Sequence, residues 1–174
     1  MSFIDYDILV IGGGHAGLEA ASIASQFESL KVALLTKSGV SIGSTPCNPA
    51  IGGVGKGQLV RELDVLGGLM PKLADSSAIQ CRTLNESKGD AVRSTRFQVD
   101  KVKYSSEARR QIELNEGIDL IEAELVDIES IDGGFSVILS SGKRVFSSKV
   151  ILTVGTFLGG RLHCGLNAKS GGRH

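Results

Sequence analysis

A glycine-rich turn near the amino terminus carries the clearest chemical signal in this chain. The apolar run Asp7–Ile11 leads into a G-x-G-x-x-G sequence, and a segment of small residues follows it. In this spacing the first glycine permits a tight turn, the second lets the backbone approach a pyrophosphate, and the third lets a helix pack close to the strand. The start of that helix favours negative charge. The sequence therefore predicts a dinucleotide site, with an ordinary glycine-rich turn as the alternative, at Gly12, Gly13, Gly14, His15, Ala16 and Gly17.

The end of the second expected strand, Lys31–Thr36, refines that prediction. NAD-binding domains place an Asp or Glu at this point to hold the ribose, whereas this chain reads Thr36-Lys37. Either the ribose is held differently or the glycines are purely structural. Three short strands expected between Leu125 and Phe146 form a β-meander, which is usual in the FAD domains of flavoproteins that bind two dinucleotides. The meander favours FAD as the cofactor.

Cys47 lies between two prolines in the glycine-rich stretch Gly43–Gly57. A loop with exposed backbone N–H groups just before a helix favours the thiolate, so Cys47 is a candidate catalytic nucleophile. The alternative is an inert thiol. Gly55-Lys56 looks like part of a phosphate-binding P-loop, but the first glycine and the magnesium-binding Ser/Thr of that motif are absent, which argues against nucleotide hydrolysis.

A basic stretch runs from Lys88 to Arg110, where seven Lys and Arg residues stand against three acids. We expect a helix over 96–114, with Arg93 and Arg96 three residues apart at its start. One reading is a solvated helix face. The sharper reading is contact with nucleic-acid phosphates, for which the candidate residues are Lys88, Arg93 and Arg96.

The remaining reactive residues suggest little further chemistry. His15 reads as a neutral imidazole beside the pyrophosphate, because nothing near it in sequence would orient a general base. The three cysteines are widely spaced, which argues against a zinc site or disulfide framework and favours a reducing cytoplasm; Cys81 and Cys164 are expected to be structural. No membrane span or targeting segment is apparent, and the formal net charge is zero, so no global field draws the chain to nucleic acid or membrane.

Hydrophobic periodicity predicts the elements that position these residues. We expect one α/β domain over residues 1–174, a Rossmann-like FAD-binding fold with a parallel sheet, helices on both faces and a β-meander crossover. The last residues, Ser170–His174, look like a chain cut within a loop. The expected helices are 16–27, 58–66 and 96–114. The expected strands are 8–11, 31–36, 77–84, 118–121 and 149–156, with the meander at 125–131, 135–139 and 143–146.

Four stretches of the chain, taken in order, closely resemble one family, MnmG, also called GidA. They read IGGGHAGLEAA, CNPAIGGVGKGQLVRELDVLGGLM, ADSSAIQCRTLNESKGDAVRSTRFQVDKVKY and LTVGTFLGG. The resemblance implies an FAD-dependent enzyme that installs a 5-carboxymethylaminomethyl group on the wobble uridine of certain tRNAs. It implies NADH as reductant, methylenetetrahydrofolate as one-carbon donor, an MnmE-type GTPase as partner, and a homodimer.

The same resemblance assigns roles to single residues. Gly12–Gly17 would hold the FAD pyrophosphate, Leu125 would contact the flavin nucleotide, and Cys47 matches one of two cysteines implicated in the chemistry. The chain lacks the family's NADH-binding domain, its helical C-terminal domain and the second cysteine, so we expect a fragment, a split-gene product or a degraded copy. The alternatives are another FAD-dependent oxidoreductase, or a non-catalytic module that binds nucleotide, tRNA or a partner.

Overall fold

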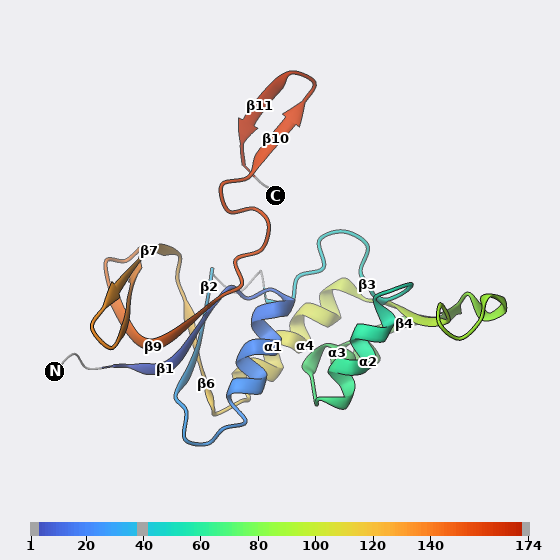
Figure 1. Ribbon diagram of the computed structural model, residues 1–174, viewed down its shortest axis with the longest axis horizontal. Helices are drawn as coiled ribbons and strands as arrows, with labels where there is room; N and C mark the ends of the chain where they lie inside the picture. Colours follow the sequence, from blue (N-terminus) through green and yellow to red (C-terminus); the bar gives the residue numbers. More distant parts are fainter. Residues whose placement is uncertain (1–3, 38–41, 172–174) are drawn as a thin grey trace.

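The main sheet of the protein contains six strands in the order β6-β2-β1-β9-β8-β7 (Figure 1). The computed structural model describes residues 4–37 and 42–171. Four strands run parallel: β1 (Tyr6–Ile11), β2 (Val32–Thr36), β6 (Ile118–Glu122) and β9 (Arg144–Leu152). The antiparallel meander adds β7 (Leu125–Ile131) and β8 (Gly134–Leu139) beyond β9.

Helices cover one face of this sheet. They are α1 (His15–Ala24) and α4 (Lys101–Glu113), and α3 (Leu69–Ser77) packs against both of these helices. Val10 and Leu34 point from the strands into a core that includes Leu18 of α1 and Tyr104 of α4. Because both faces of the central strands are buried, β2 is apolar almost throughout and all five of its residues are buried.

The opposite face of the sheet is covered by the meander. Leu9 and Leu35 pack there against Val137, Leu139 and Val145, which come from β8 and β9. The Rossmann-like class is confirmed, but the expectation of helices on both faces is wrong for the part of the chain that the structure describes. The curled meander buries the second face with its own apolar side chains, so that face needs no helix there.

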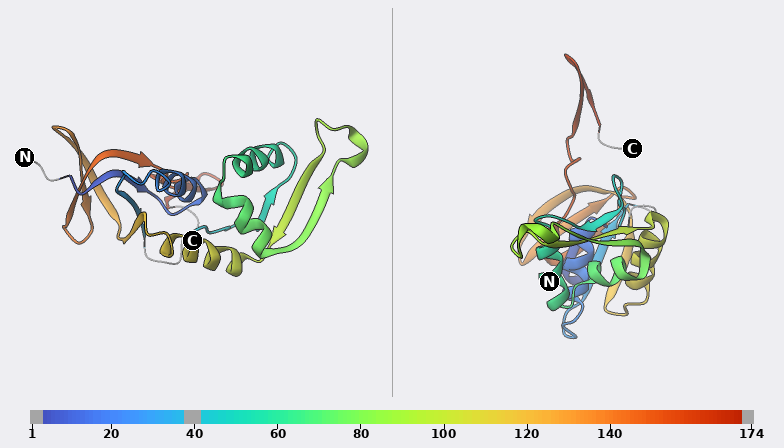
Figure 2. Two further views of the ribbon diagram at one scale, coloured as in Figure 1. Left: turned by 90° about the horizontal axis from the view of Figure 1, so that it is seen from below. Right: turned by 90° about the vertical axis from the view of Figure 1, so that its right-hand side faces the viewer.

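A smaller antiparallel sheet stands beside the helices, in the order β3-β5-β4. Its strands are β3 (Ala50–Gly52), β4 (Ala78–Leu84) and β5 (Ser94–Val99), and α2 (Gly57–Val65) follows β3. We call β4, β5 and the turn between them the ribbon; it projects from the body of the protein (Figures 1 and 2). All of β4 except its last residue, Leu84, is exposed, so the outer strand of the ribbon faces solvent.

Several expected boundaries are wrong. Residues 96–99 belong to β5, and α4 begins only at Lys101, where the Asp100 carboxylate accepts hydrogen bonds from the N–H groups of Val102 and Lys103 at 2.9 Å. Strands expected at 143–146 and 149–156 are one strand, β9. The structure also contains α3, which was not predicted, and α1 ends at Ala24.

A hairpin near the carboxyl end extends away from the body (Figure 1). It consists of β10 (Arg161–Cys164) and β11 (Asn167–Ser170), and the residues of both strands are exposed. Residues 172–174 of the expected terminal loop lie outside the described residues. Among the helices described for residues 4–37 and 42–171, none has the length and hydropathy needed to cross a membrane.

Candidate functional site

The glycine loop is locked to the end of β9. The hydroxyl of Thr153 donates to the carbonyl oxygens of Ile11 at 2.9 Å and Gly12 at 3.1 Å. Gly12 has φ +119°, and a side chain there would collide with the Thr153 carbonyl. A side chain at Gly17 would collide with the Gly12 carbonyl and lie 2.8 Å from the Thr153 hydroxyl oxygen. These two glycines therefore permit the turn and the close helix–strand approach that the fingerprint predicts.

Gly14 differs from its neighbours because it faces open space. A Cβ added to it would have nothing within 4 Å, and the residue is exposed. It is the N-cap of α1, and no side-chain hydrogen bond caps the helix there. Backbone N–H groups at such a helix start lack intrahelical partners and favour an anion. The open side of the loop fits the pyrophosphate of a dinucleotide.

His15 packs against a buried tyrosine beneath this opening. Its ring centroid lies 5.6 Å from that of Tyr104, with the planes tilted by 43°. Burial lowers the pKa of His15, although the Glu19 carboxylate acts in the opposite direction. Within the described part of the chain, the buried Nε2 of His15 and the buried hydroxyl of Tyr104 have no hydrogen-bond partner. The structure thus favours the neutral imidazole expected from the sequence.

Glu19 has a structural role that the sequence did not reveal. Its carboxylate accepts hydrogen bonds from the backbone N–H groups of Leu69 at 2.9 Å and Met70 at 2.6 Å. These N–H groups begin α3, whose own N-cap residue, Gly68, offers no side chain. The glycine-loop helix therefore caps a helix that lies fifty residues further along the chain.

The ends of β2 and β6 meet at the same edge of the sheet as the glycine loop. A Cβ added to Gly13 would lie 2.5 Å from the hydroxyl oxygen of Thr36, the last residue of β2. The Ala123 N–H, just after β6, donates to the Thr36 carbonyl at 2.9 Å. Leu125 follows within two residues and is half-buried against the meander-side core. The structure thus brings Leu125 to the carboxyl edge of the sheet, where α/β proteins bind their ligands.

This edge also holds an acid that strand two does not supply. Glu124 forms an ion pair with Lys37, with 2.5 Å between Nζ and Oε1. The sequence offers no acid at the end of the second strand, and the acid at this edge, Glu124, comes from the turn between β6 and β7. The neighbouring residue Leu125, which the family resemblance links to the flavin nucleotide, was the sequence signal for this position.

Cys47 lies in a loop anchored at both ends. Before it, the Gly43 N–H donates to the Gly13 carbonyl at 2.9 Å; after it, the Pro49 carbonyl accepts from Val99 N–H at 2.8 Å. The Cys47 side chain is exposed. The loop therefore presents a thiol between the glycine loop and the base of the ribbon. Cys81 and Cys164 are exposed too, so the structural role expected for them is not one of core packing.

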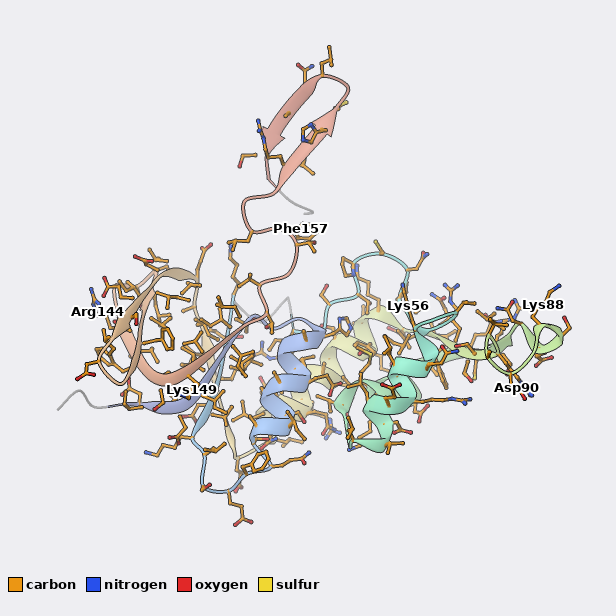
Figure 3. The ribbon with its side chains drawn as sticks, in the orientation of Figure 1. Lys56, Lys88, Asp90, Arg144, Lys149 and Phe157 are labelled. Carbon is orange, nitrogen blue, oxygen red and sulfur yellow. The ribbon has the colours of Figure 1, made fainter. Side chains whose placement is uncertain are left out.

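The three candidate nucleic-acid residues lie on the ribbon and not on a helix. Lys88 belongs to a short 3₁₀ turn at the ribbon tip, Arg93 follows it, and Arg96 is in β5. Figure 3 shows Lys88 and Asp90 at that tip. The later basic residues Arg109 and Arg110 are on α4, where they pair with glutamates. The expected positive helix face is therefore wrong, because Arg93 and Arg96 lie on the ribbon and the helical residues Arg109 and Arg110 are paired with glutamates.

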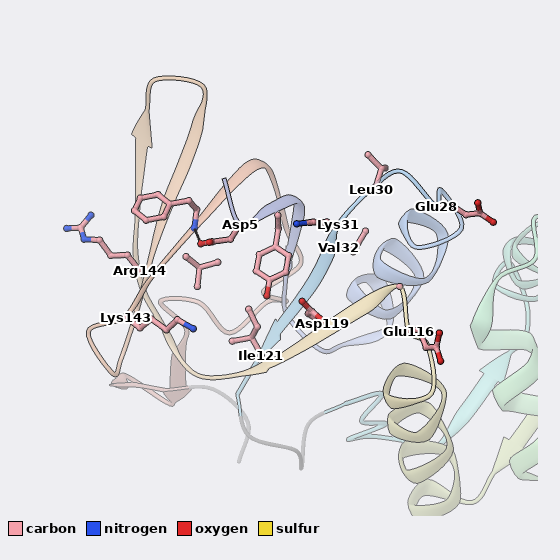
Figure 4. A pocket seen from close by; sticks show the side chains of 14 residues that line it. Asp5, Glu28, Leu30, Lys31, Val32, Glu116, Asp119, Ile121, Lys143 and Arg144 are labelled. Carbon is pink, nitrogen blue, oxygen red and sulfur yellow. Dashed lines mark hydrogen bonds between the residues drawn. The ribbon is translucent and has the colours of Figure 1, made fainter. Parts of the chain in front are cut away.

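A cavity of about 830 Å³ opens at the opposite edge of the main sheet (Figure 4). Tyr6 and Val32 line it from the beginnings of β1 and β2, together with Asp119, Lys31 and Lys143. Its lining mixes acids and bases and includes none of the residues predicted from the sequence to bind or react. The predicted site and this cavity lie at different edges of the sheet.

Comparison with known proteins places the whole arrangement in one family. The family model described as "Glucose inhibited division protein A" matches residues 7–174. Two crystal forms of GidA from Aquifex aeolicus have TM-scores of 0.86 and 0.85 at 39% and 40% identity, and match 97% and 94% of this chain. The chain spans 28% and 27% of those proteins. A GidA-related protein from Thermus thermophilus, at 20% identity and TM-score 0.63, shares the fold; 94% of this chain matches 59% of it.

Proposed function

Because this chain belongs to the GidA family, we propose that it is the FAD-binding part of a tRNA-modifying flavoenzyme. The reaction proposed is installation of a carboxymethylaminomethyl group at C5 of the wobble uridine, with a one-carbon donor and NADH-reduced flavin. The chain spans 28% of the Aquifex protein, so the NADH site, the MnmE-type GTPase partner and the homodimer belong to the proposal for a full-length protein.

The residues present fit FAD. Gly12–Gly17 and the open start of α1 would hold the pyrophosphate, and Leu125 would contact the nucleotide from the neighbouring strand end. Bound FAD would supply two-electron redox chemistry. The neutral His15 adds no positive charge, so the helix N-terminus is the feature of this loop that favours the phosphates.

One observation carries the tRNA-modification proposal: the Cys47 loop joins the glycine loop to the base of the basic ribbon. Three parts of the site would then follow one another in space. They are a dinucleotide on Gly14, a thiol at Cys47, and RNA phosphates on Lys88, Arg93 and Arg96. In this arrangement Cys47 acts as the nucleophile toward the uracil ring, while the ribbon holds the RNA.

Purification tests the cofactor first. The isolated chain, or the chain after addition of FAD, should show flavin absorption and quench FAD fluorescence. A colourless protein that takes up no FAD would contradict the cofactor assignment and leave a non-catalytic role.

The RNA and cysteine assignments are tested separately. Binding of a tRNA with a modifiable wobble uridine should weaken when Lys88, Arg93 and Arg96 are all changed to Ala. In a full-length GidA chain containing these residues, Cys47→Ser should abolish modification while FAD binding is kept. Full modification by that variant would remove Cys47 from the mechanism.

A further inference from the structure

Two arginines lie directly opposite each other on the ribbon. Arg82 of β4 pairs in register with Arg96 of β5. Residues directly opposite in an antiparallel pair point to the same face, with Cβ atoms about 5 Å apart. Like charges in this position destabilise the sheet, so the arrangement works against the stability of the ribbon itself.

Three arginines of the described chain, Arg109, Arg110 and Arg144, form ion pairs with neighbouring carboxylates, whereas no ion pair is formed there by Arg61, Arg93 or Arg161. Arg109 pairs with Glu113 at 2.6 Å and with Glu122 at 2.8 Å, and Arg144 pairs with Glu129. Over residues 4–37 and 42–171, by contrast, no ion pair involves Arg82 or Arg96. The strand register therefore places the two arginines opposite each other, and no described carboxylate forms an ion pair with either.

Of the two arginines, Arg82 is exposed and Arg96 is half-buried. On the other side of Arg96, β3 contributes Gly52, which has no side chain to cover the guanidinium. Lys56, at the start of α2, lies near the base of the ribbon, and Lys88 lies at its tip (Figure 3). Cations therefore lie near both ends of the ribbon with the arginine pair between them, and the tip also carries the acids Glu86 and Asp90.

The two faces of the ribbon differ in chemistry. Strand alternation puts Cys81 and Thr83 on the face opposite to Arg82, and Thr95 and Phe97 opposite to Arg96. That second face carries no charge at these positions, and Phe97 packs against the helix-side core. The charged residues of the two strands, Arg82 and Arg96, therefore lie on one face of the ribbon.

We propose that Arg82 and Arg96 form a phosphate-binding face through which the ribbon docks on the backbone of an RNA. This inference rests on the proposed function, which supplies the RNA, and adds Arg82 and a single docking face to it. Planar guanidinium groups bind phosphate oxygens through two N–H donors, and two adjacent groups suit a partner with regularly spaced phosphates. A charged residue on an edge strand can also serve only to prevent aggregation, and the experiment separates these roles.

A charge-relocation variant tests the face directly. The double change Arg82→Thr and Thr83→Arg keeps composition and net charge but moves the cation to the opposite face. Binding of a tRNA with a modifiable wobble uridine is measured by fluorescence anisotropy between about 50 and 200 mM salt, alongside Arg82→Ala. Both variants should lower the salt slope by about 0.7 to 0.9, so that their deficit relative to wild type changes about threefold over this range.

The possible results distinguish failure of the docking-face proposal from failure of the proposed function. If the relocated variant binds like wild type, any cation on the ribbon suffices and the docking face is wrong, although weakened binding by Arg93→Ala would still support the proposed function. If wild type does not bind tRNA, both fail. If polyglutamate displaces the RNA as well as polyuridylate does, the face serves an acidic protein and not an RNA. Arg82→Lys, which keeps the charge but loses the fork, should bind at an intermediate level, and circular dichroism melting checks that each variant folds.

Discussion

Two glycines of the same fingerprint should respond differently to alanine: Gly17→Ala should mainly lower the unfolding free energy, and Gly14→Ala should mainly weaken FAD binding. Gly17→Ala inserts a methyl group against the Gly12 carbonyl and the Thr153 hydroxyl. Overpacking of this kind costs about 1–3 kcal/mol, and each displaced hydrogen bond of Thr153 about 1 kcal/mol. We expect about 3 kcal/mol of lost unfolding free energy, which corresponds to a melting temperature lower by about 6–12 °C.

Gly14→Ala meets no atom within 4 Å and does not require a positive φ. Alanine is a poorer N-cap than glycine, so we expect a loss of about 1 kcal/mol or less. The same methyl group stands where a pyrophosphate must approach the backbone, and it should weaken FAD binding at least about tenfold, or 1.4 kcal/mol.

Urea unfolding followed by circular dichroism measures the first quantity, and quenching of FAD fluorescence measures the second. An equal loss of unfolding free energy in Gly17→Ala and Gly14→Ala would contradict these roles of the two glycines. The reasoning is also refuted if Gly14→Ala binds FAD as tightly as the wild-type protein does.

Three further predictions concern stability and ionisation. Glu19→Ala should lower the unfolding free energy by about 2 kcal/mol, because it removes the acceptor for two N–H groups of α3, whereas Glu62→Ala on exposed α2 should change it by less than about 0.5 kcal/mol in urea unfolding. Burial, then a hydrogen bond to Asp119 and the nearby acidic charges, raises the pKa of Tyr6 to about 12, so its contribution to stability is complete below pH 10 and is lost between pH 10 and 12. Because the chain has no Trp and burial also raises the pKa of Tyr104, absorbance near 295 nm should show little phenolate below about pH 11, and Asp119→Asn should move its appearance to lower pH. Burial lowers the pKa of His15, so the unfolded chain binds the proton more readily, and the free energy of unfolding should fall as the pH drops below about 6.5. His15→Gln should make the melting temperature less dependent on pH in that range. An unchanged dependence of melting temperature on pH would contradict the assignment.

Local signals along the chain were sufficient for the central strands and for the glycine loop. The continuous apolar runs around Val10 and Leu34 can be buried on both sides only in the middle of a sheet, and the glycine spacing allows few other uses. Leu125 could also be placed, because it begins a strand bounded by clear turn residues.

The starts of α4 and α3 could not be predicted from local sequence, because they depend on residues that are distant in the chain. The expected helix over 96–114 begins too early because Arg96 pairs with strands on both sides, a tertiary contact that overrides local helical spacing. Asp100 was the local signal for the true start. Helix α3 begins on the carboxylate of Glu19, and no window around Leu69 contains that residue.

The basic residues show the same limit at the candidate site. The sequence shows how many basic residues there are, but not which of them are paired with acids. Arg109 forms ion pairs with Glu113 and Glu122, whereas Arg96 lies opposite Arg82 on the neighbouring strand. Register between strands, which no local pattern specified, decides which cations are left for a partner.

The pairing of β1 with β9 has a consequence for the order in which the molecule is built. These neighbours in the sheet join Ile11 to Leu152, so the contact is among the most distant in sequence that the fold makes. Contacts of such high contact order form slowly, and during synthesis they must wait for the far segment to leave the ribosome. The glycine loop is among the first parts to be made, yet the Thr153 hydroxyl that hydrogen-bonds to it lies 142 residues after Ile11 in the sequence. A nascent chain therefore carries an unfinished glycine loop until Thr153 has left the ribosome, and a dinucleotide can select for the folded state only after β9 has paired with β1.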